Sequence, residues 1–132
     1  MTYLLDVNVL ISLGFKRHDF HERVEAWIQT LPEIRFATCA ITELGFVRIL
    51  AQHPDYDLTV ASARDKLKQL KSALGKRLVF ITDDVGVERL PAWVKHPKQT
   101  TDGHLAALAK THGAVLATLD AKIPGVFLLP GK

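Results

Sequence analysis

Four acidic residues of this sequence occupy positions from which an α/β protein could bring them together. Two of them follow directly on short apolar stretches that read as buried strands, and the other two stand near the starts of amphipathic helices. In parallel α/β sheets, ligands bind outside the carboxyl ends of the strands. We therefore expect four carboxylates to converge at one edge of a sheet: Asp6, Glu43, Asp102 and Asp120.

Glu43 is informative on its own, because it is the only charged residue between Arg35 and Arg48. Its neighbours three and four positions on in the expected helix are Phe46 and Val47. Burying a carboxylate without a partner is costly. The pattern therefore predicts that Glu43 has a partner.

Carboxylates crowded at one place repel each other and take up protons unless a cation holds them. The chain has a single cysteine, Cys39, and no paired histidine spacing, so the available ligands are oxygens. Oxygen ligands select hard ions such as Mg²⁺ or Mn²⁺ over zinc. With a nucleic acid as substrate, such an ion can generate and align a hydroxide for phosphodiester hydrolysis. The net charge of +3 suits a polyanionic partner without requiring one.

The apolar pattern predicts short strands that alternate with helices. Strands are expected at residues 3–5, 34–38, 78–81 and 114–118, with a last short one at 126–129, and helices at 7–13, 20–30, 40–52, 58–74 and 100–113. The strands are almost continuously apolar, which is typical of a parallel sheet covered on both faces. We expect one α/β domain over residues 1–132, with a sheet of four or five strands and a segment at 86–97 that wraps the surface.

The composition excludes several classes of protein. With 48% hydrophobic and 23% charged residues, the chain is not disordered, collagen-like or a coiled coil. No apolar run approaches 18 residues, and no basic region precedes the first apolar stretch, so we expect neither a membrane span nor a signal peptide. A cytoplasmic protein with a buried, unpaired Cys39 is the expectation.

The segments around the four acids resemble the acidic motifs of PIN-domain ribonucleases, and most of all the VapC-type toxins of bacterial toxin–antitoxin pairs. These segments are LLDVNVLI at 4–11, ITELGFVR at 41–48, TTDGHLAALA at 100–109 and ATLD at 117–120. They follow in the family's order and together span residues 3–120. The resemblance implies a PIN-like three-layer fold and a Mg²⁺- or Mn²⁺-dependent endoribonuclease that cuts single-stranded or looped RNA. It also implies a homodimer that is inhibited by a small antitoxin from the same operon.

Carried over by position, the resemblance assigns metal binding to Asp6, Glu43, Asp102 and Asp120. It makes Asn8 and Thr118 the polar residues that orient these acids or a bound water. In the mechanism we expect, the first three acids hold the principal metal ion, and Asp120 positions a second ion or the attacking water. The residues after Asp120 are Ala-Lys-Ile, so an additional acid that some relatives carry there is missing.

Other charged residues have two open interpretations. Arg48 can pair with an acid or a phosphate, or extend into solvent. A basic flank formed by Arg64, Lys68 and Lys71 can follow an RNA backbone or be an ordinary solvated helix face. The adjacent pair Asp83 and Asp84 is interpreted as a solvated loop, and no histidine, His104 included, is expected to act as a general base.

Two functions are alternatives to a metal-dependent ribonuclease. The first is a PIN-like domain that binds RNA or a partner protein without catalysis. The second is a small-molecule phosphatase or phosphoacceptor domain with Asp6 as nucleophile. The segment Asp6-Val7-Asn8 argues against the second, because it lacks the second Asp of haloacid-dehalogenase-like enzymes, and no acid pair lies beside the first strand. The sequence also lacks a P-loop and a Gly-rich dinucleotide fingerprint.

Overall fold

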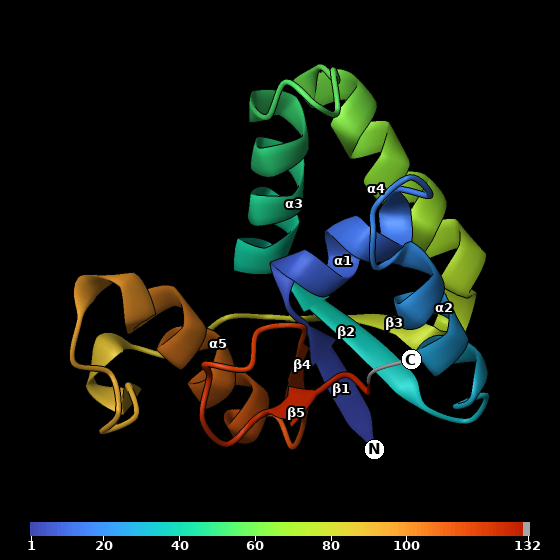
Figure 1. The fold of residues 1–132 in the computed structure, drawn as a ribbon. Coiled ribbons are helices and arrows are strands. Elements are labelled where there is room, and N and C mark those ends of the chain that lie inside the picture. The colour runs from blue at the N-terminus through green and yellow to red at the C-terminus, as the bar shows by residue number, and fades with distance from the viewer. Residues whose placement is uncertain (131–132) are drawn as a thin grey trace.

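A parallel sheet of five strands forms the centre of the molecule in the computed structural model, which describes residues 1–130 (Figure 1). The strands run side by side in the order β3-β2-β1-β4-β5. Their bounds are β1 Thr2–Leu5, β2 Arg35–Cys39, β3 Leu78–Ile81, β4 Val115–Thr118 and β5 Phe127–Leu128. All five carboxyl ends therefore lie at the same edge, and the chain segments that follow β1, β2 and β4 are neighbours there.

Five helices connect the strands, as the spacing of apolar residues predicts. They are α1 Val7–Gly14, α2 His21–Gln29, α3 Ala40–Gln52, α4 Val60–Leu74 and α5 Thr100–Thr111. Every predicted element is confirmed, with ends that differ by at most two residues. The segment expected to wrap the surface contains the 3₁₀ turn Val87–Arg89, and a second one, Pro97–Gln99, leads directly into α5.

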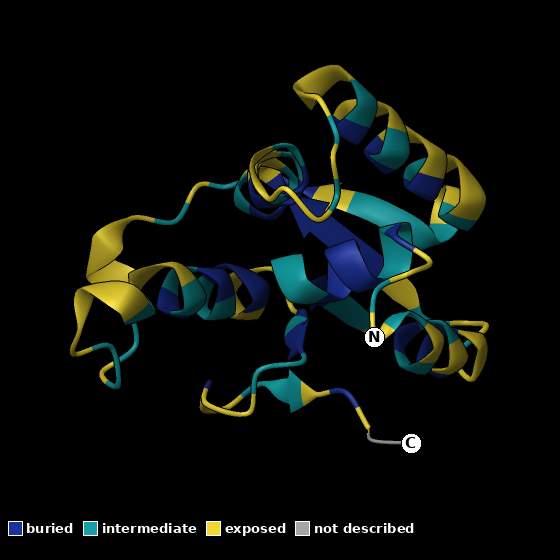
Figure 2. Ribbon diagram, turned by 45° about the horizontal axis from the view of Figure 1, so that its top comes forward, coloured by how far each residue is buried: buried dark blue, intermediate teal, exposed yellow. Residues whose placement is uncertain are grey.

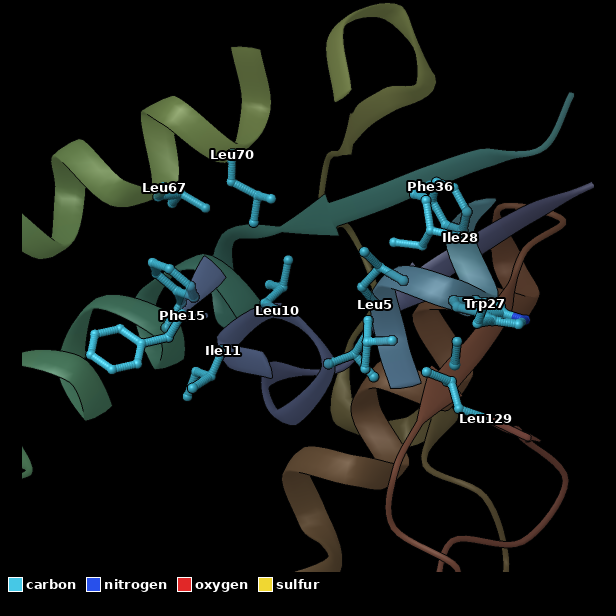
Figure 3. Packing of buried hydrophobic residues seen from close by; sticks show 14 of the residues in the cluster. Leu5, Leu10, Ile11, Phe15, Trp27, Ile28, Phe36, Leu67, Leu70 and Leu129 are labelled. Atoms are coloured by element: carbon cyan, nitrogen blue, oxygen red, sulfur yellow. The ribbon is translucent and has the colours of Figure 1, made fainter. Parts of the chain in front are cut away.

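The strands place alternate side chains on opposite faces of the sheet. Leu5, Phe36 and Ala117 belong to a buried cluster that also contains residues of α1, α2, α3 and α4. Figure 3 shows this cluster, with Leu10 of α1 and Leu70 of α4 packed toward the sheet. These four helices thus cover one face of the sheet.

The other face is covered by α5. Leu4, Ala37 and Leu116 pack there with Leu105 and Leu108 of that helix. The result is a three-layer α/β arrangement. In Figure 2 the burial follows these layers, with buried residues along the strands and exposed ones on the outward sides of the helices. We call the two sides of the sheet the α5 face and the four-helix face.

Two glycines allow close packing of the helices that carry acids. A Cβ atom on Gly45 of α3 would lie 2.7 Å from Cγ2 of Val7, the first residue of α1. A Cβ on Gly103 of α5 would overlap Val94 in the segment that precedes the helix. Glycine therefore lets α3 approach α1, and lets the loop before α5 pack onto that helix.

Within residues 1–130, no helix is both long and apolar enough to cross a membrane. Cys39 lies in the interior of the sheet and is completely buried, as expected.

Candidate active site

Asp6 is the residue at which the first strand becomes the first helix. Its backbone N–H donates to the carbonyl of Ala117, at 2.9 Å, and continues the pairing of β1 with β4. Its side chain caps α1, because Oδ1 accepts the backbone N–H of Val7 at 2.7 Å. Only 6% of the residue is exposed. A short apolar strand followed by a capping acid therefore buries a carboxylate at the carboxyl end of the central strand.

Thr118 holds the second oxygen of this carboxylate. Its hydroxyl donates to Oδ2 of Asp6 over 2.8 Å, and the residue is completely buried. The same hydroxyl oxygen accepts from Nδ2 of Asn8, at 3.2 Å, and from the backbone N–H of Asp120, at 3.0 Å. Asn8 is fixed in turn, because its Oδ1 accepts the backbone N–H of Leu119 at 3.1 Å. The two orienting residues expected from the sequence thus form one network with Asp6.

Three aspartates interact electrostatically at this place. Burial raises the pKa of Asp6, against the hydrogen bonds from Thr118 and Val7, and the charge of Asp120 raises it further. Burial also raises the pKa of Asp102, in the first turn of α5, and the charges of Asp6 and Asp120 add to that rise. The fold therefore concentrates negative charge at the carboxyl ends of β1 and β4, on the side of the sheet that α5 covers.

Glu43 has a different environment. It lies in the first turn of α3, and its Oε2 accepts two bonds of 2.6 Å, one from the hydroxyl of Thr38 and one from the ammonium of Lys71. Thr38 is on the four-helix face of the sheet, since strand alternation places it on the same side as Phe36. Thr38 and Lys71 are therefore the partners of Glu43, for which the sequence predicts a partner without identifying it.

The structure thus brings three of the four predicted acids together and pairs the fourth with a lysine. Among residues 1–130, no group of three or more His, Cys, Asp and Glu side chains is arranged to hold a metal ion. The donor types nevertheless fit a hard divalent cation, because the three aspartates offer oxygens only. Burial is the main cause of the raised pKa values of Asp6 and Asp102, and the neighbouring carboxylates add to the rise, so a bound cation would favour the charged forms.

Asp83 lies in a loop, as expected, but the expectation that its side chain is solvated is wrong. Its Oδ2 lies 2.5 Å from Nε2 of His104, and the two side chains are only 21% and 16% exposed. Burial alone would raise the pKa of Asp83, but hydrogen bonds from His104 and from the backbone of Val85, with the charges of His104 and His112, lower it. Asp84 is 72% exposed, as expected. The only sequence signal for the contact between Asp83 and His104 was the position of an acid just beyond a predicted strand.

The basic residues that the sequence singled out differ in how far they are exposed. Arg48, Arg64 and Lys68 are exposed, whereas Lys71 is half-buried through its contact with Glu43. Of the predicted basic flank, only Lys71 therefore touches a predicted site residue in the described part of the chain.

Comparison with known proteins identifies the class to which this fold and these acids belong. The family model of the PIN domain matches residues 3–126. The chain belongs to the PIN-domain family.

Two relatives from Mycobacterium tuberculosis are similar over almost the whole chain. Ribonuclease VapC38 is 38% identical over 131 residues, which cover 96% of this chain and 88% of the relative. Ribonuclease VapC44 is 40% identical over 129 residues, which cover 93% of this chain and 89% of the relative. The segments that carry all four acids lie in the PIN-domain match.

Solved structures share the fold at low sequence identity. VapBC2 from Rickettsia felis, bound to a DNA fragment from its promoter, superimposes with a TM-score of 0.65 at 17% identity and covers 97% of both chains. VapC20 of M. tuberculosis, described as a toxin that cleaves the sarcin-ricin loop, has a TM-score of 0.63 at 14% identity, over 94% of this chain and 95% of that one. The three-layer fold expected from the sequence is therefore confirmed.

Proposed function

We propose that this protein is a metal-dependent endoribonuclease and the toxin of a toxin–antitoxin pair. The observation that carries the proposal is the group of Asp6, Asp102 and Asp120 at the carboxyl ends of β1 and β4, where two of the three carboxyl groups have raised pKa values. The relatives named Ribonuclease VapC support RNA as the substrate. A site rich in carboxylates cannot bind a phosphate chain by itself, so the proposal requires a cation between the two.

Mg²⁺ or Mn²⁺ is the proposed cofactor, with Asp6, Asp102, Asp120 and Glu43 as its candidate ligands. When bound, such an ion lowers the pKa of a water molecule and neutralises charge on the leaving oxygen of a phosphodiester. The residues of the chain fix the geometry. Thr118 holds Oδ2 of Asp6, and Asn8 holds Thr118, so the carboxylate of Asp6 keeps one orientation as a ligand must.

Asp120 is proposed to position the attacking water or a second ion. Its Oδ1 accepts the backbone N–H of Lys122 at 2.9 Å, which orients the carboxyl group just beyond β4. The backbone N–H of Asp120 donates to Thr118, so the orientations of Asp6 and Asp120 depend on the same hydroxyl.

A small antitoxin protein, a second copy of this chain and a cytoplasmic location complete the proposal. Support for an antitoxin comes from the structural relatives, which include VapBC2 of R. felis and the FitAB protein of a complex with a DNA fragment. The excess of three positive charges favours a polyanionic substrate.

The test is incubation of the purified chain with total bacterial RNA in Mg²⁺ or Mn²⁺ and in EDTA, beside the Asp6→Ala variant, with sequencing of the RNA ends. We expect discrete cuts that need both the metal and Asp6. A folded Asp6→Ala protein that cuts the same sites as the wild type overturns the proposal. RNA that is retained but left intact by the wild type in every condition favours the non-catalytic alternative.

A further inference from the structure

Lys71 joins the last turn of α4 to the first turn of α3. It lies in the last turn of α4, 28 positions after Glu43, and its Nζ reaches Oε2 of that residue at 2.6 Å. The side chains of Lys71 and Glu43 are 40% and 19% exposed. The carboxylate is thus mostly enclosed, while the ammonium is partly open to solvent. The pair compensates the enclosed carboxylate of Glu43, and it also places a partly exposed ammonium beside a proposed metal ligand.

The surroundings of Lys71 keep its ammonium at one place. Phe80 of β3 is the register partner of Thr38 in β2, so the two side chains lie on the same face of the sheet. The ammonium of Lys71 is 5.8 Å from the centre of the Phe80 ring, within the range of a cation–π contact. Oε2 of Glu43 is already bonded to Thr38. The cation therefore rests between a fixed carboxylate and an aromatic ring.

The exposed side of this arrangement is basic and partly aromatic. Phe80 is 53% exposed. Lys68 and Arg64 precede Lys71 by three and seven residues on α4, which places all three on one side of the helix, and both are exposed. A phosphate chain that approaches Glu43 along α4 would meet these cations in succession. Lys71 is the innermost of them.

Building on the function proposed above, we propose that Lys71 is an exchangeable counter-ion: it holds Glu43 in the metal-free protein, and binds an RNA phosphate once a metal ion takes Glu43. A single carboxylate cannot fully neutralise two cations, and an ammonium and a divalent ion near each other repel. Metal binding by Glu43 therefore weakens the hold on Lys71. The released ammonium stays tethered to α4 beside Glu43, where an RNA phosphate is the available anion.

An ordinary structural ion pair would behave differently. If Lys71 only kept Glu43 in position, its removal would leave metal affinity unchanged or lower it. The exchange predicts opposite effects of the same substitution: tighter metal binding and weaker RNA binding. These opposite signs separate the two explanations without any measurement of cleavage.

The first experiment is calorimetric titration of Mn²⁺ into the metal-free full chain. We expect Lys71→Met to bind Mn²⁺ about two- to fivefold more tightly than the wild type, because a competing charge of surface-pair strength is gone. Lys68→Met, one turn away on the same basic side, and Lys71→Arg should both bind Mn²⁺ like the wild type. If Lys71→Met fails to fold, Lys71→Gln replaces it. Unchanged or weaker Mn²⁺ binding in a folded variant overturns the proposal.

The second experiment measures binding of a labelled random-sequence 20-nucleotide RNA by stopped-flow anisotropy in the first second after mixing, in EDTA and in Mn²⁺. Lys71→Met should weaken RNA binding in Mn²⁺ and have little effect in EDTA, where Glu43 retains the ammonium. Lys68→Met should weaken RNA binding equally in Mn²⁺ and in EDTA. Equal losses for Lys71→Met in both conditions overturn the exchange. A wild type that binds neither Mn²⁺ nor RNA contradicts the proposed function itself.

Discussion

The hydroxyl of Thr118 donates to Oδ2 of Asp6 over 2.8 Å, and it is the only side chain among residues 1–130 that hydrogen-bonds this carboxylate. The hydroxyl has no remaining capacity, since it also accepts from Asn8 and from the backbone N–H of Asp120. One buried oxygen therefore fixes the relative positions of three residues of the proposed site.

Thr118→Val removes this oxygen while keeping the shape of the side chain. We expect a loss of about 1–3 kcal/mol in the free energy of unfolding, because the buried carboxylate of Asp6 and two partly buried donors, on Asn8 and Asp120, lose their partner. Metal affinity should fall roughly 10- to 100-fold, as is usual when a partner that orients a ligand is removed. Chemical denaturation and calorimetric Mn²⁺ titration measure the two effects. Thr118→Ser keeps the hydroxyl and is the control; equal losses in both variants would refute the role assigned to the oxygen.

Asp102→Asn removes a charge that burial and the neighbouring aspartates both disfavour, without breaking a hydrogen bond that the described residues show. We expect the metal-free variant to be more stable than the wild type at pH 7, by roughly 0.5–1 kcal/mol. The direction of this change in stability follows from the raised pKa of Asp102. The folded protein disfavours the charged carboxylate, so wild-type stability is retained below the ordinary pKa of 3.8 and is lost as the pH rises through the raised value.

The gain in Asp102→Asn should therefore disappear in acid. Saturating Mg²⁺ should reverse the order at pH 7, because a ligand that binds the folded state stabilises the protein with the intact site. Denaturation curves across pH, with and without Mg²⁺, supply both comparisons. Asp84→Asn, at an exposed position, should show neither effect. A metal-free Asp102→Asn protein that is less stable than the wild type at pH 7 would speak against crowded carboxylates.

Asp83→Asn should change the stability in the opposite direction to Asp102→Asn. The pKa of Asp83 is lowered in the folded protein, so its contribution to stability is present above the ordinary pKa of 3.8 and is lost as the pH falls through the lowered value. We expect the variant to lose about 0.5–1 kcal/mol near pH 6 and to approach the wild type in strong acid. Thermal unfolding at several pH values measures this difference. A loss that is the same at every pH would assign the effect to packing rather than to the pair with His104.

The sequence predicts most of this fold because its local signals agree with the tertiary structure. Strands such as Leu78–Ile81 are short apolar runs bounded by polar residues, and helices such as Val60–Leu74 carry apolar residues at intervals of three and four. Asp6 and Asp120 could be placed at the same sheet edge because parallel strands align their carboxyl ends.

What the sequence could not predict are side-chain contacts between distant segments. Glu43 required a partner, but periodicity alone does not distinguish Lys71 from its neighbours on the same side of α4. Likewise, Asp83 and His104 are 21 residues apart, and they meet because the end of β3 lies beside α5. Such contacts depend on the relative placement of helices and strands, which short-range patterns leave open.

The most direct test of the account is the rate of RNA cleavage by wild type, Asp6→Asn and Asp84→Asn in Mg²⁺, with EDTA as the blank. The two variants lose the same charge by the same change, one at the buried centre of the proposed site and one at an exposed position outside it. We expect cleavage by wild type and Asp84→Asn, and none by Asp6→Asn or in EDTA. Cleavage by a folded Asp6→Asn protein at the wild-type rate would contradict it.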